Sequence, residues 1–368
     1  MVPVLIYELS NFGFSGSGAA ESVRDGTIHG IKDKTSFACG DFDCTLQRVR
    51  DYDEIVKAIG NGKGSAITAT LAVRLVPEGD PSEKGLDEKS LVERNADERS
   101  TDDFADAICE LLSLANKNTV YWLRRTSLDF AGQRTGSFVR NMGAKLSPFL
   151  SGWGLIPDFV AIPGTGFRHE LSYFLGTVAP GYIQQKRRKG LDRVIAWVLD
   201  SEHQSTVDMM YLSAYIAIEQ LRIAFLERGN LPTMIQDDWL DLLDEGLTDE
   251  IIACVEARTC GLTSAQRNLL ARNLRLANNP PATLELEALC KQLGVQGYEK
   301  EIGLLRNKLV HTGRYGDFDF PDAITLYFKL SHLIDVCVLK LLGYDGYYQH
   351  KVTNWKPTRL ANQSAAAA

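Results

Sequence analysis

The chain has 368 residues, of which 45% are hydrophobic and 24% charged, and its formal net charge is −7. This length predicts two or three domains, and the apolar fraction is enough to build cores without disulfides or structural metal ions. Because the chain is acidic overall, a uniformly basic nucleic-acid-coating protein is excluded, and any nucleic-acid site must be a local patch.

The cysteines are scattered and include no CxxC pair: Cys39, Cys44, Cys109, Cys254, Cys260, Cys290 and Cys337. This odd set argues against a zinc site and a disulfide framework, and is typical of reduced thiols. Residues 1–10 lack the basic start and apolar run of a signal peptide, and no stretch reaches the roughly 18 uncharged apolar residues of a membrane span. We therefore expect a cytoplasmic protein with no membrane contact, no metal and no other cofactor.

Residues 1–190 are rich in glycine and in short β-prone runs. Three of these runs, bounded by turn residues, predict strands at Val4–Tyr7, Ala66–Val73 and Thr119–Leu123. One helix is expected from Thr101 to Ala115, with a Thr-Asp-Asp cap at its start and a single apolar face. We read this half as a mixed, mostly β domain.

The segment Glu78–Asp103 holds ten acidic and four basic residues. It is interpreted as a solvated loop, with an acidic binding segment as the alternative.

Three polar motifs are weaker candidates for a functional site. Gly13–Gly18 lacks the Lys-Ser/Thr of a P-loop and is read as a flexible turn. Arg168-His169-Glu170 offers an acid–base pair, and Asp41-Phe42-Asp43 could bind a metal only with distant partners.

From about Leu191 to His350 the hydrophobic period is helical, which predicts an all-α domain after the β-rich one and hence an α+β protein. The expected helices are Tyr211–Phe225, Asp238–Leu247, Asp249–Ala257, Ser264–Leu276, Pro280–Gly294, Gly297–Val310 and Pro321–Leu342. Residues 351–368 are polar and end in four alanines, so a disordered tail is expected there.

The helix predicted after Gly297 carries one narrow apolar stripe, made of Tyr298, Ile302, Leu305 and Leu309. This stripe must face the core. Asn307 and His311 are four residues apart and share a face roughly opposite the stripe, with Arg306 on the flank. All three side chains are therefore expected to point away from the core of their own domain.

These residue types suit phosphodiester chemistry. Gly313 is a natural end for the helix, and a histidine in the last turn meets the negative end of the helix dipole, which favours its protonated form. Arg306 can hold a phosphate and stabilise its developing charge, and Asn307 can orient the imidazole or a phosphate oxygen. RNA supplies its own nucleophile, the 2′-hydroxyl, so no metal is needed. The alternative is that His311 only caps the helix end.

The segment Arg306-Asn307-x-x-x-His311 resembles the RNxxxH form of the Rx4-6H motif of HEPN domains. The preceding long helix with Glu219, the glycine at 313, the apolar closing helix and the segment Leu341–Gly346 also resemble that family. The resemblance covers about Leu191–His350. A β-rich half before such a domain is similar to the ApeA-type anti-phage proteins.

The resemblance implies a metal-independent endoribonuclease that acts on RNA, tRNA among the candidates, as a homodimer or higher homo-oligomer. Arg306 and His311 of two subunits would meet across a shared cleft and leave a 2′,3′-cyclic phosphate and a 5′-hydroxyl. It further implies a toxin-like effector of antiviral defence by abortive infection, with residues 1–190 as the sensor of a phage-derived trigger. Glu219 would orient a catalytic group, or make a structural polar contact.

RNA phosphates are expected to meet Lys308 and the basic cluster Lys186, Arg187, Arg188 and Lys189. The alternative reading of that cluster is a solvated linker between the domains. The runner-up for the whole protein is a non-catalytic HEPN dimerisation or nucleic-acid-binding module, with the function in residues 1–190.

Overall fold

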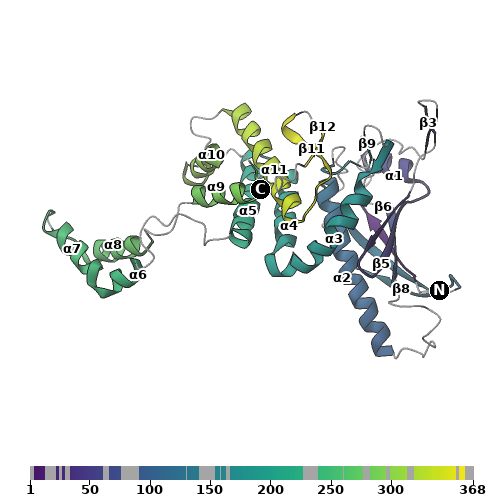
Figure 1. Ribbon diagram of the computed structural model, residues 1–368, viewed down its shortest axis with the longest axis horizontal. Coiled ribbons are helices and arrows are strands. Elements are labelled where there is room, and N and C mark those ends of the chain that lie inside the picture. Colours follow the sequence, from purple (N-terminus) through teal and green to yellow (C-terminus); the bar gives the residue numbers. More distant parts are fainter. Residues whose placement is uncertain are drawn as a thin grey trace, which may run out of the picture.

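The computed structural model describes residues 4–12, 22–24, 27–29, 34–60, 66–75, 91–129, 131–140, 154–157, 159–162, 166–226, 239–259, 261–276, 282–295, 299–312, 319–353 and 356–360. A β-sheet region in the N-terminal half is followed by a run of helices (Figure 1). The α+β class expected from the sequence is confirmed at this level.

The main sheet is antiparallel and six-stranded, in the order β4-β5-β6-β1-β7-β8. Its strands are β1 (Val4–Ser10), β4 (Lys34–Cys39), β5 (Phe42–Arg48), β6 (Ile67–Leu75), β7 (Tyr121–Leu128) and β8 (Arg134–Val139). The three strands predicted from β-prone runs are confirmed as the central ones, β1, β6 and β7. Short two-stranded pairs are β2 (Ser22–Arg24) with β3 (Thr27–His29), and β9 (Phe159–Ile162) with β10 (Gly166–His169).

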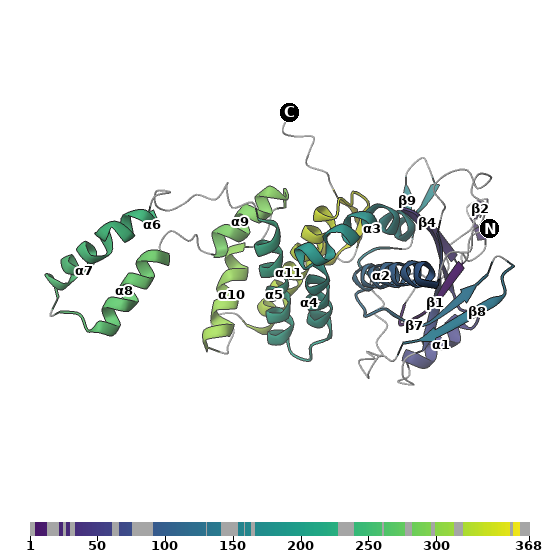
Figure 2. The same ribbon diagram turned by 90° about the horizontal axis from the view of Figure 1, so that it is seen from below.

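Helix α2 (Leu91–Asn116) lies against one face of this sheet (Figure 2). The rings of Phe104 and Phe42 are 4.3 Å apart, and Trp122 donates to Asp106 at 2.9 Å. The predicted helix at 101–115 is confirmed, but its start is wrong: Thr101 is a buried residue inside the helix. The loop interpretation is likewise wrong for 91–103, which are helical, because once the apolar face anchors the helix, strong helix formers such as Glu, Arg and Ala prolong it. Residues 78–90 of that segment lie outside the described residues. Helix α1 (Tyr52–Gly60) connects β5 to β6.

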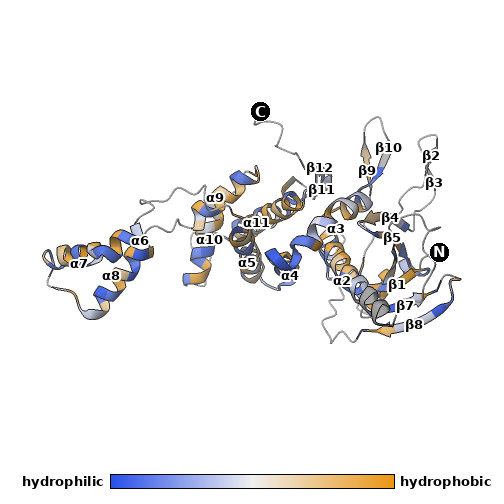
Figure 3. Ribbon diagram, turned by 60° about the horizontal axis from the view of Figure 1, so that its bottom comes forward, coloured by the Kyte–Doolittle hydropathy of each residue, from blue (hydrophilic) through white to orange (hydrophobic). Residues whose placement is uncertain are grey.

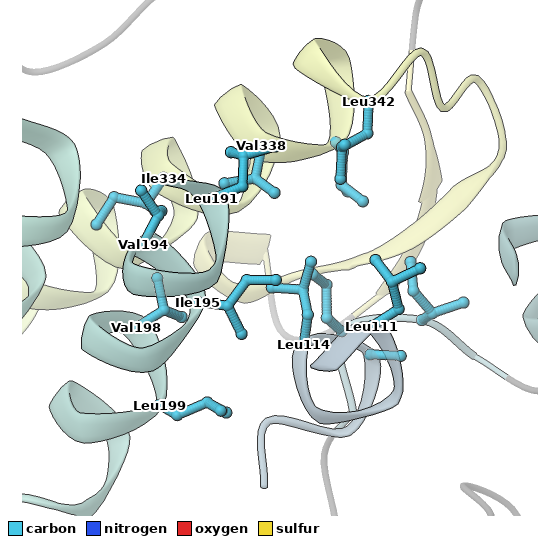
Figure 4. Close-up of a cluster of buried hydrophobic side chains, with 14 of the residues drawn as sticks. Leu111, Leu114, Leu191, Val194, Ile195, Val198, Leu199, Ile334, Val338 and Leu342 are labelled. Carbon is cyan, nitrogen blue, oxygen red and sulfur yellow. The ribbon is translucent and has the colours of Figure 1, made fainter. Parts of the chain in front are cut away.

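Helices α3 (Glu170–Lys189) and α4 (Leu191–His203) follow, joined at Gly190 with φ 66°. The boundary expected at residue 190 falls between them. Figure 4 shows Leu111 and Leu114 of α2 together with Leu191 and Ile195 of α4 and Val338 of α11 in one buried cluster. The two halves of the chain therefore share a hydrophobic core.

Helix α5 (Val207–Phe225) packs against α4 and against α11 (Phe320–Leu341). Helices α9 (Ala282–Gln292) and α10 (Glu299–Thr312) lie beside it. The helices predicted for these segments are confirmed. Across the described residues, no helix combines the length and the apolar character that crossing a bilayer requires.

The segment after α11 folds back onto the body. Strands β11 (Tyr347–His350) and β12 (Lys356–Arg359) pair, with a 3₁₀ turn at Lys351–Thr353 between them. Lys351 and Leu360 are buried. The expected disordered tail is therefore wrong for 351–353 and 356–360, because its order comes from β pairing and ion pairs with distant residues that local composition does not disclose. Residues 361–368 lie outside the described residues.

Three further elements lie together at one end of the molecule, apart from the other helices in both views (Figures 1 and 2). They are α6 (Trp239–Leu242) with a π-helical turn at Leu243–Leu247, α7 (Thr248–Glu256) and α8 (Ser264–Leu276). We call residues 239–276 the arm. The helices predicted here are confirmed, and no described residue of the arm belongs to the hydrophobic core.

Candidate functional site

Helix α10 presents its residues as the helical wheel predicts. Ile302, Leu305 and Leu309 are buried, which confirms the apolar stripe, whereas Tyr298 lies outside the described residues. The Tyr211 hydroxyl of α5 donates to the backbone oxygen of Ile302 at 2.6 Å and fixes the helix to the core. Asn307, Lys308 and His311 are exposed and Arg306 is half-buried. The expectation that the motif faces away from the core is therefore confirmed for Asn307 and His311, and Arg306 lies on the flank.

Arg306 is held by two contacts. Its guanidinium lies over the ring of Tyr215 from α5, 5.6 Å from the centroid, and its Nη1 donates to Oδ1 of Asn307 at 3.0 Å. A cation over an aromatic face is stabilised by about 0.5–2 kcal/mol, which orders a long side chain that otherwise samples many rotamers. Tyr215 thus acts as a platform for Arg306.

Glu219 lies behind this platform. It accepts the hydrogen bond of the Tyr215 hydroxyl, and burial, reinforced by the charge of Glu219, raises the pKa of Tyr215 to about 12. Glu219 also pairs with Arg222 at 2.6 Å, and Arg222 pairs with Glu285 of α9. Of the two interpretations of Glu219, these contacts match the structural one: Glu219 holds Tyr215, and within the described residues it makes no hydrogen bond or ion pair with Arg306 or His311.

Tyr215, Arg222 and Glu285 were missed by sequence reasoning. Tyr215 lies four residues before Glu219 and seven before Arg222, which places all three on one side of α5. That spacing was a usable signal. Glu285 gave none, because its approach depends on how α9 docks.

His311 lies exposed in the last turn of α10. Within the described parts of the chain it has no hydrogen-bond or ionic partner. Helix geometry separates residues 306 and 311 by about 140° around the axis and about 7.5 Å along it. One subunit therefore does not present the guanidinium and the imidazole on one face. A site that uses both on one phosphate needs a second surface.

The contacts also fix the direction of α10. Tyr211 meets Ile302 and Tyr215 meets Arg306, so the paired residues advance together and α10 runs parallel to α5. His311 therefore lies towards the C-terminal end of α5. The ammonium of Lys189 reaches the same end, where it donates to the backbone oxygen of Ala224 at 2.6 Å.

The basic cluster 186–189 forms the last turn of α3, so the linker reading is wrong. Lys186 pairs with Glu110 at 2.6 Å, and Arg187 lies 3.5 Å from Asp103. Arg188 is exposed and has no ion pair among the residues that the structure describes. A tight αL glycine ends this helix, and basic side chains in its last turn favour the C-terminal dipole.

The described residues also test two of the three weaker polar motifs. Glu170 is fully buried and accepts from Arg168 at 2.7 Å and from the backbone NH of Tyr347 at 2.6 Å, with the Tyr344 hydroxyl as a further donor. It ties α3 to the C-terminal segment and has no open side for acid–base work. Around Asp41–Asp43, as elsewhere in the described residues, no three His, Cys, Asp or Glu side chains are placed to hold a metal ion. Gly13–Gly18 lies outside the described residues.

Two further features went unanticipated. A hollow of about 490 Å³ lies on β1, β4, β5 and β6, and contains no residue of the predicted site. A buried charge cluster joins four distant segments: Lys117 pairs with Asp335, and Lys351 contacts Asp335 at 3.4 Å and also pairs with Glu202. Burial alone would lower the pKa of Lys351, but the two carboxylates raise it above its usual range. We call these four residues the charge cluster.

Comparison of the chain with protein-family models, with curated proteins and with solved structures finds no match in any of the three.

Proposed function

We propose that this protein is a metal-independent endoribonuclease of the HEPN type, active as a homodimer through Arg306 and His311. The observation that carries the proposal is the exposed imidazole at the end of α10, which has no partner among the described residues and follows by five positions an arginine that is ordered on an aromatic platform. Resemblance of the RNxxxH segment to the HEPN motif supplies the reaction class.

RNA and the homodimer together supply every group that the reaction needs. The His311 imidazole of one subunit takes the proton of the 2′-hydroxyl while the 2′-oxygen attacks phosphorus. The bond from phosphorus to the 5′-oxygen breaks, and the leaving oxygen takes a proton from the imidazolium of the second subunit. Arg306 stabilises the negative charge that develops on the phosphoryl oxygens, and Asn307 orients that guanidinium. The products are a 2′,3′-cyclic phosphate and a 5′-hydroxyl.

A two-fold dimer is supported by exposed apolar residues near the motif. Met209, Ile216 and Ile223 are exposed on α5 at spacings of seven, beside the face that carries Tyr215. Seven-residue spacing keeps side chains on one seam between paired helices. Leu304 and Val310 of α10 are also exposed. An isologous contact over α5 and α10 would cover these side chains and bring two copies of the motif together.

A path for RNA is supported by the basic groups at one end of the bundle. Lys308 is exposed on α10, and the last turn of α3 with Arg187, Arg188 and Lys189 lies towards the same end of α5 as His311. Phosphate contacts of this kind carry most of the affinity for RNA and weaken as salt rises. We propose tRNA among the substrates, and a role in antiviral abortive infection with the sheet region as the sensor of a phage-derived trigger.

The test is cleavage of tRNA and total RNA by the full chain in EDTA. We expect His311→Ala and Arg306→Ala to abolish cleavage and keep the wild-type circular dichroism spectrum, because both side chains lie off the buried stripe. Matched controls are His203→Ala, which removes another helix-end histidine, and Arg134→Ala, which removes an exposed arginine on β8. Both controls should cleave as the wild type does. A fully active His311→Ala protein rules the assignment out.

The alternative is a non-catalytic dimerisation or nucleic-acid-binding module. The exposed apolar seam on α5 supports this alternative as well as it supports the ribonuclease, because dimer formation through such a seam requires no catalytic residue. It does not explain why the neighbouring helix α10 carries an arginine ordered on Tyr215 and an exposed histidine that has no partner among the described residues. This alternative predicts RNA binding or dimer formation without cleavage under any activating condition.

A further inference from the structure

The arm is a unit tied together by polar contacts. Trp239 donates to the backbone oxygen of Leu274 at 2.8 Å, Arg267 pairs with Glu256 at 2.6 Å, and Arg275 pairs with Asp244. These contacts join the first and last helices of the arm and clamp α7 to α8. The arm therefore has a defined shape before anything docks on it.

Its apolar surface is not covered. Leu243 is the one buried hydrophobic residue among the described residues of the arm, and neither α7 nor α8 has a buried residue. Leu269 and Leu276 of α8 are 49% and 52% exposed and seven residues apart, so they share one side of the helix. Leu274, on the other side of the helix, is half-buried. Figure 3 shows hydrophobic residues along both α7 and α8.

The opposite helix presents a complementary face. Glu250, Ala253, Cys254 and Ala257 are exposed at spacings of three and four, on the side of α7 away from its half-buried Ile251. Small side chains let a second helix approach closely, and two leucines seven residues apart are the projecting side chains that fit such a face. The arm thus carries a projecting face on α8 and a receiving face on α7.

The two helices that carry these faces also differ in charge. Helix α8 carries three basic and no acidic residues, which are Arg267, Arg272 and Arg275. The stretch from α6 to the start of α7 carries only acidic ones, which are Asp241, Asp244, Glu245, Asp249 and Glu250. Arg272 lies between the two exposed leucines and, like Glu250, has no ion pair among the described residues. The arm as a whole has six acidic and four basic residues, which disfavours RNA as its partner.

We propose that the arm is a self-association element that docks on the arm of a second copy of this chain. The α8 face of each copy, Leu269 and Leu276 with Arg272 between them, packs on the α7 face of the other, with Glu250 opposite Arg272. A two-fold axis makes this contact twice, so each apolar stripe is covered and each free charge is paired. The inference does not depend on ribonuclease activity.

The test is the mass of the full chain in solution, by sedimentation equilibrium across a concentration series. Leu269→Asp/Leu276→Asp should raise the dissociation constant of the assembly at least about tenfold, which is about 1.4 kcal/mol. Arg272→Glu and Glu250→Arg should each weaken association, and the two combined should restore it, because the pair is re-formed with exchanged signs. Arg134→Glu on the distant β8 is the charge-matched control and should change nothing.

Labelling of the exposed Cys254 gives a second readout that does not depend on mass. Alkylation of this thiol should slow as the wild-type concentration rises, and should stay fast in Leu269→Asp/Leu276→Asp. A wild-type chain that is monomeric at all concentrations overturns the proposal, as does an unchanged mass in the leucine variant or failure of the charge exchange to restore association. Loss of association by Ile216→Asp together with wild-type behaviour of every arm variant would assign self-association to α5 instead.

Discussion

The substitution Asp335→Asn removes one carboxylate from the charge cluster without changing the size of the side chain. Asp335 and Lys117 are 1% and 2% exposed, so water cannot take the place of the missing charge. Lys117 and Lys351 would then face Glu202 alone. Breaking a buried ion pair by removing one partner costs about 3–5 kcal/mol, against a total stability of about 5–15 kcal/mol for a typical protein. We expect Asp335→Asn to lower the free energy of unfolding by about 3–5 kcal/mol.

A double-mutant cycle separates the loss of the pair from the loss of each group. Lys117→Met removes one ammonium and leaves Asp335 paired with Lys351, so it should cost less than Asp335→Asn. Lys117→Met/Asp335→Asn leaves the balanced pair of Lys351 and Glu202, and should recover stability relative to Asp335→Asn. The exposed pair of Arg275 and Asp244, at 54% and 59%, is the control, and Asp244→Asn should cost under about 1 kcal/mol.

Urea unfolding followed by tryptophan fluorescence and by circular dichroism measures all four variants. Because Lys117 follows α2 and Asp335 lies on α11, the cluster joins the sheet region to the helices, and both probes should report one coincident transition. A cost below about 1 kcal/mol for Asp335→Asn, or a double variant less stable than Asp335→Asn, would show that the charge cluster does not stabilise the fold in this way. Two separate transitions would contradict the shared core.

Three further changes have defined outcomes. Gly346→Ala should destabilise the protein by about 1–3 kcal/mol in urea unfolding, because the added Cβ would lie 2.1 Å from Oε1 of Glu170; an unchanged midpoint would show that this turn has room. Burial, together with the nearby His350, lowers the pKa of His332 from 6.5 to about 4, so the stability it confers is present above pH 6.5 and is lost as pH falls towards 4. His332→Phe should flatten the stability profile between these values, and an identical acid slope in both proteins would contradict this. Tyr215→Phe keeps the ring under Arg306 and should retain cleavage, whereas Tyr215→Ala should reduce it. Equal cleavage by the two variants would show that the ring of Tyr215 does not support the reaction.

The helices of the bundle could be predicted because their cores are built at helical spacing. The stripe Ile302, Leu305 and Leu309 is one example, and it also fixed the exposed face of α10. Helix α3 was not predicted, because Gly176, Pro180 and Gly181 lie inside it and each disfavours a helix locally. Packing against α2, α4 and β4 overrides that preference.

The parts of the site that join different helices could not be predicted. The position of Tyr215 under Arg306 depends on α10 running parallel to α5, and the ion pair of Arg222 with Glu285 depends on the docking of α9. No local pattern carries these orientations. The order of the C-terminal segment was missed for the same reason, since Lys351 is held by carboxylates from α4 and α11.

The chemical nature of the new RNA ends distinguishes attack by the 2′-hydroxyl from hydrolysis by water. Wild-type protein in EDTA is incubated with an RNA and with its 2′-O-methylated counterpart, and the fragment ends are identified by mass spectrometry. We expect 2′,3′-cyclic phosphates and 5′-hydroxyls from the first substrate, no cleavage of the second, and no fragments with His311→Ala. Fragments with 3′-hydroxyls and 5′-phosphates, or cleavage of the methylated RNA, would contradict this mechanism.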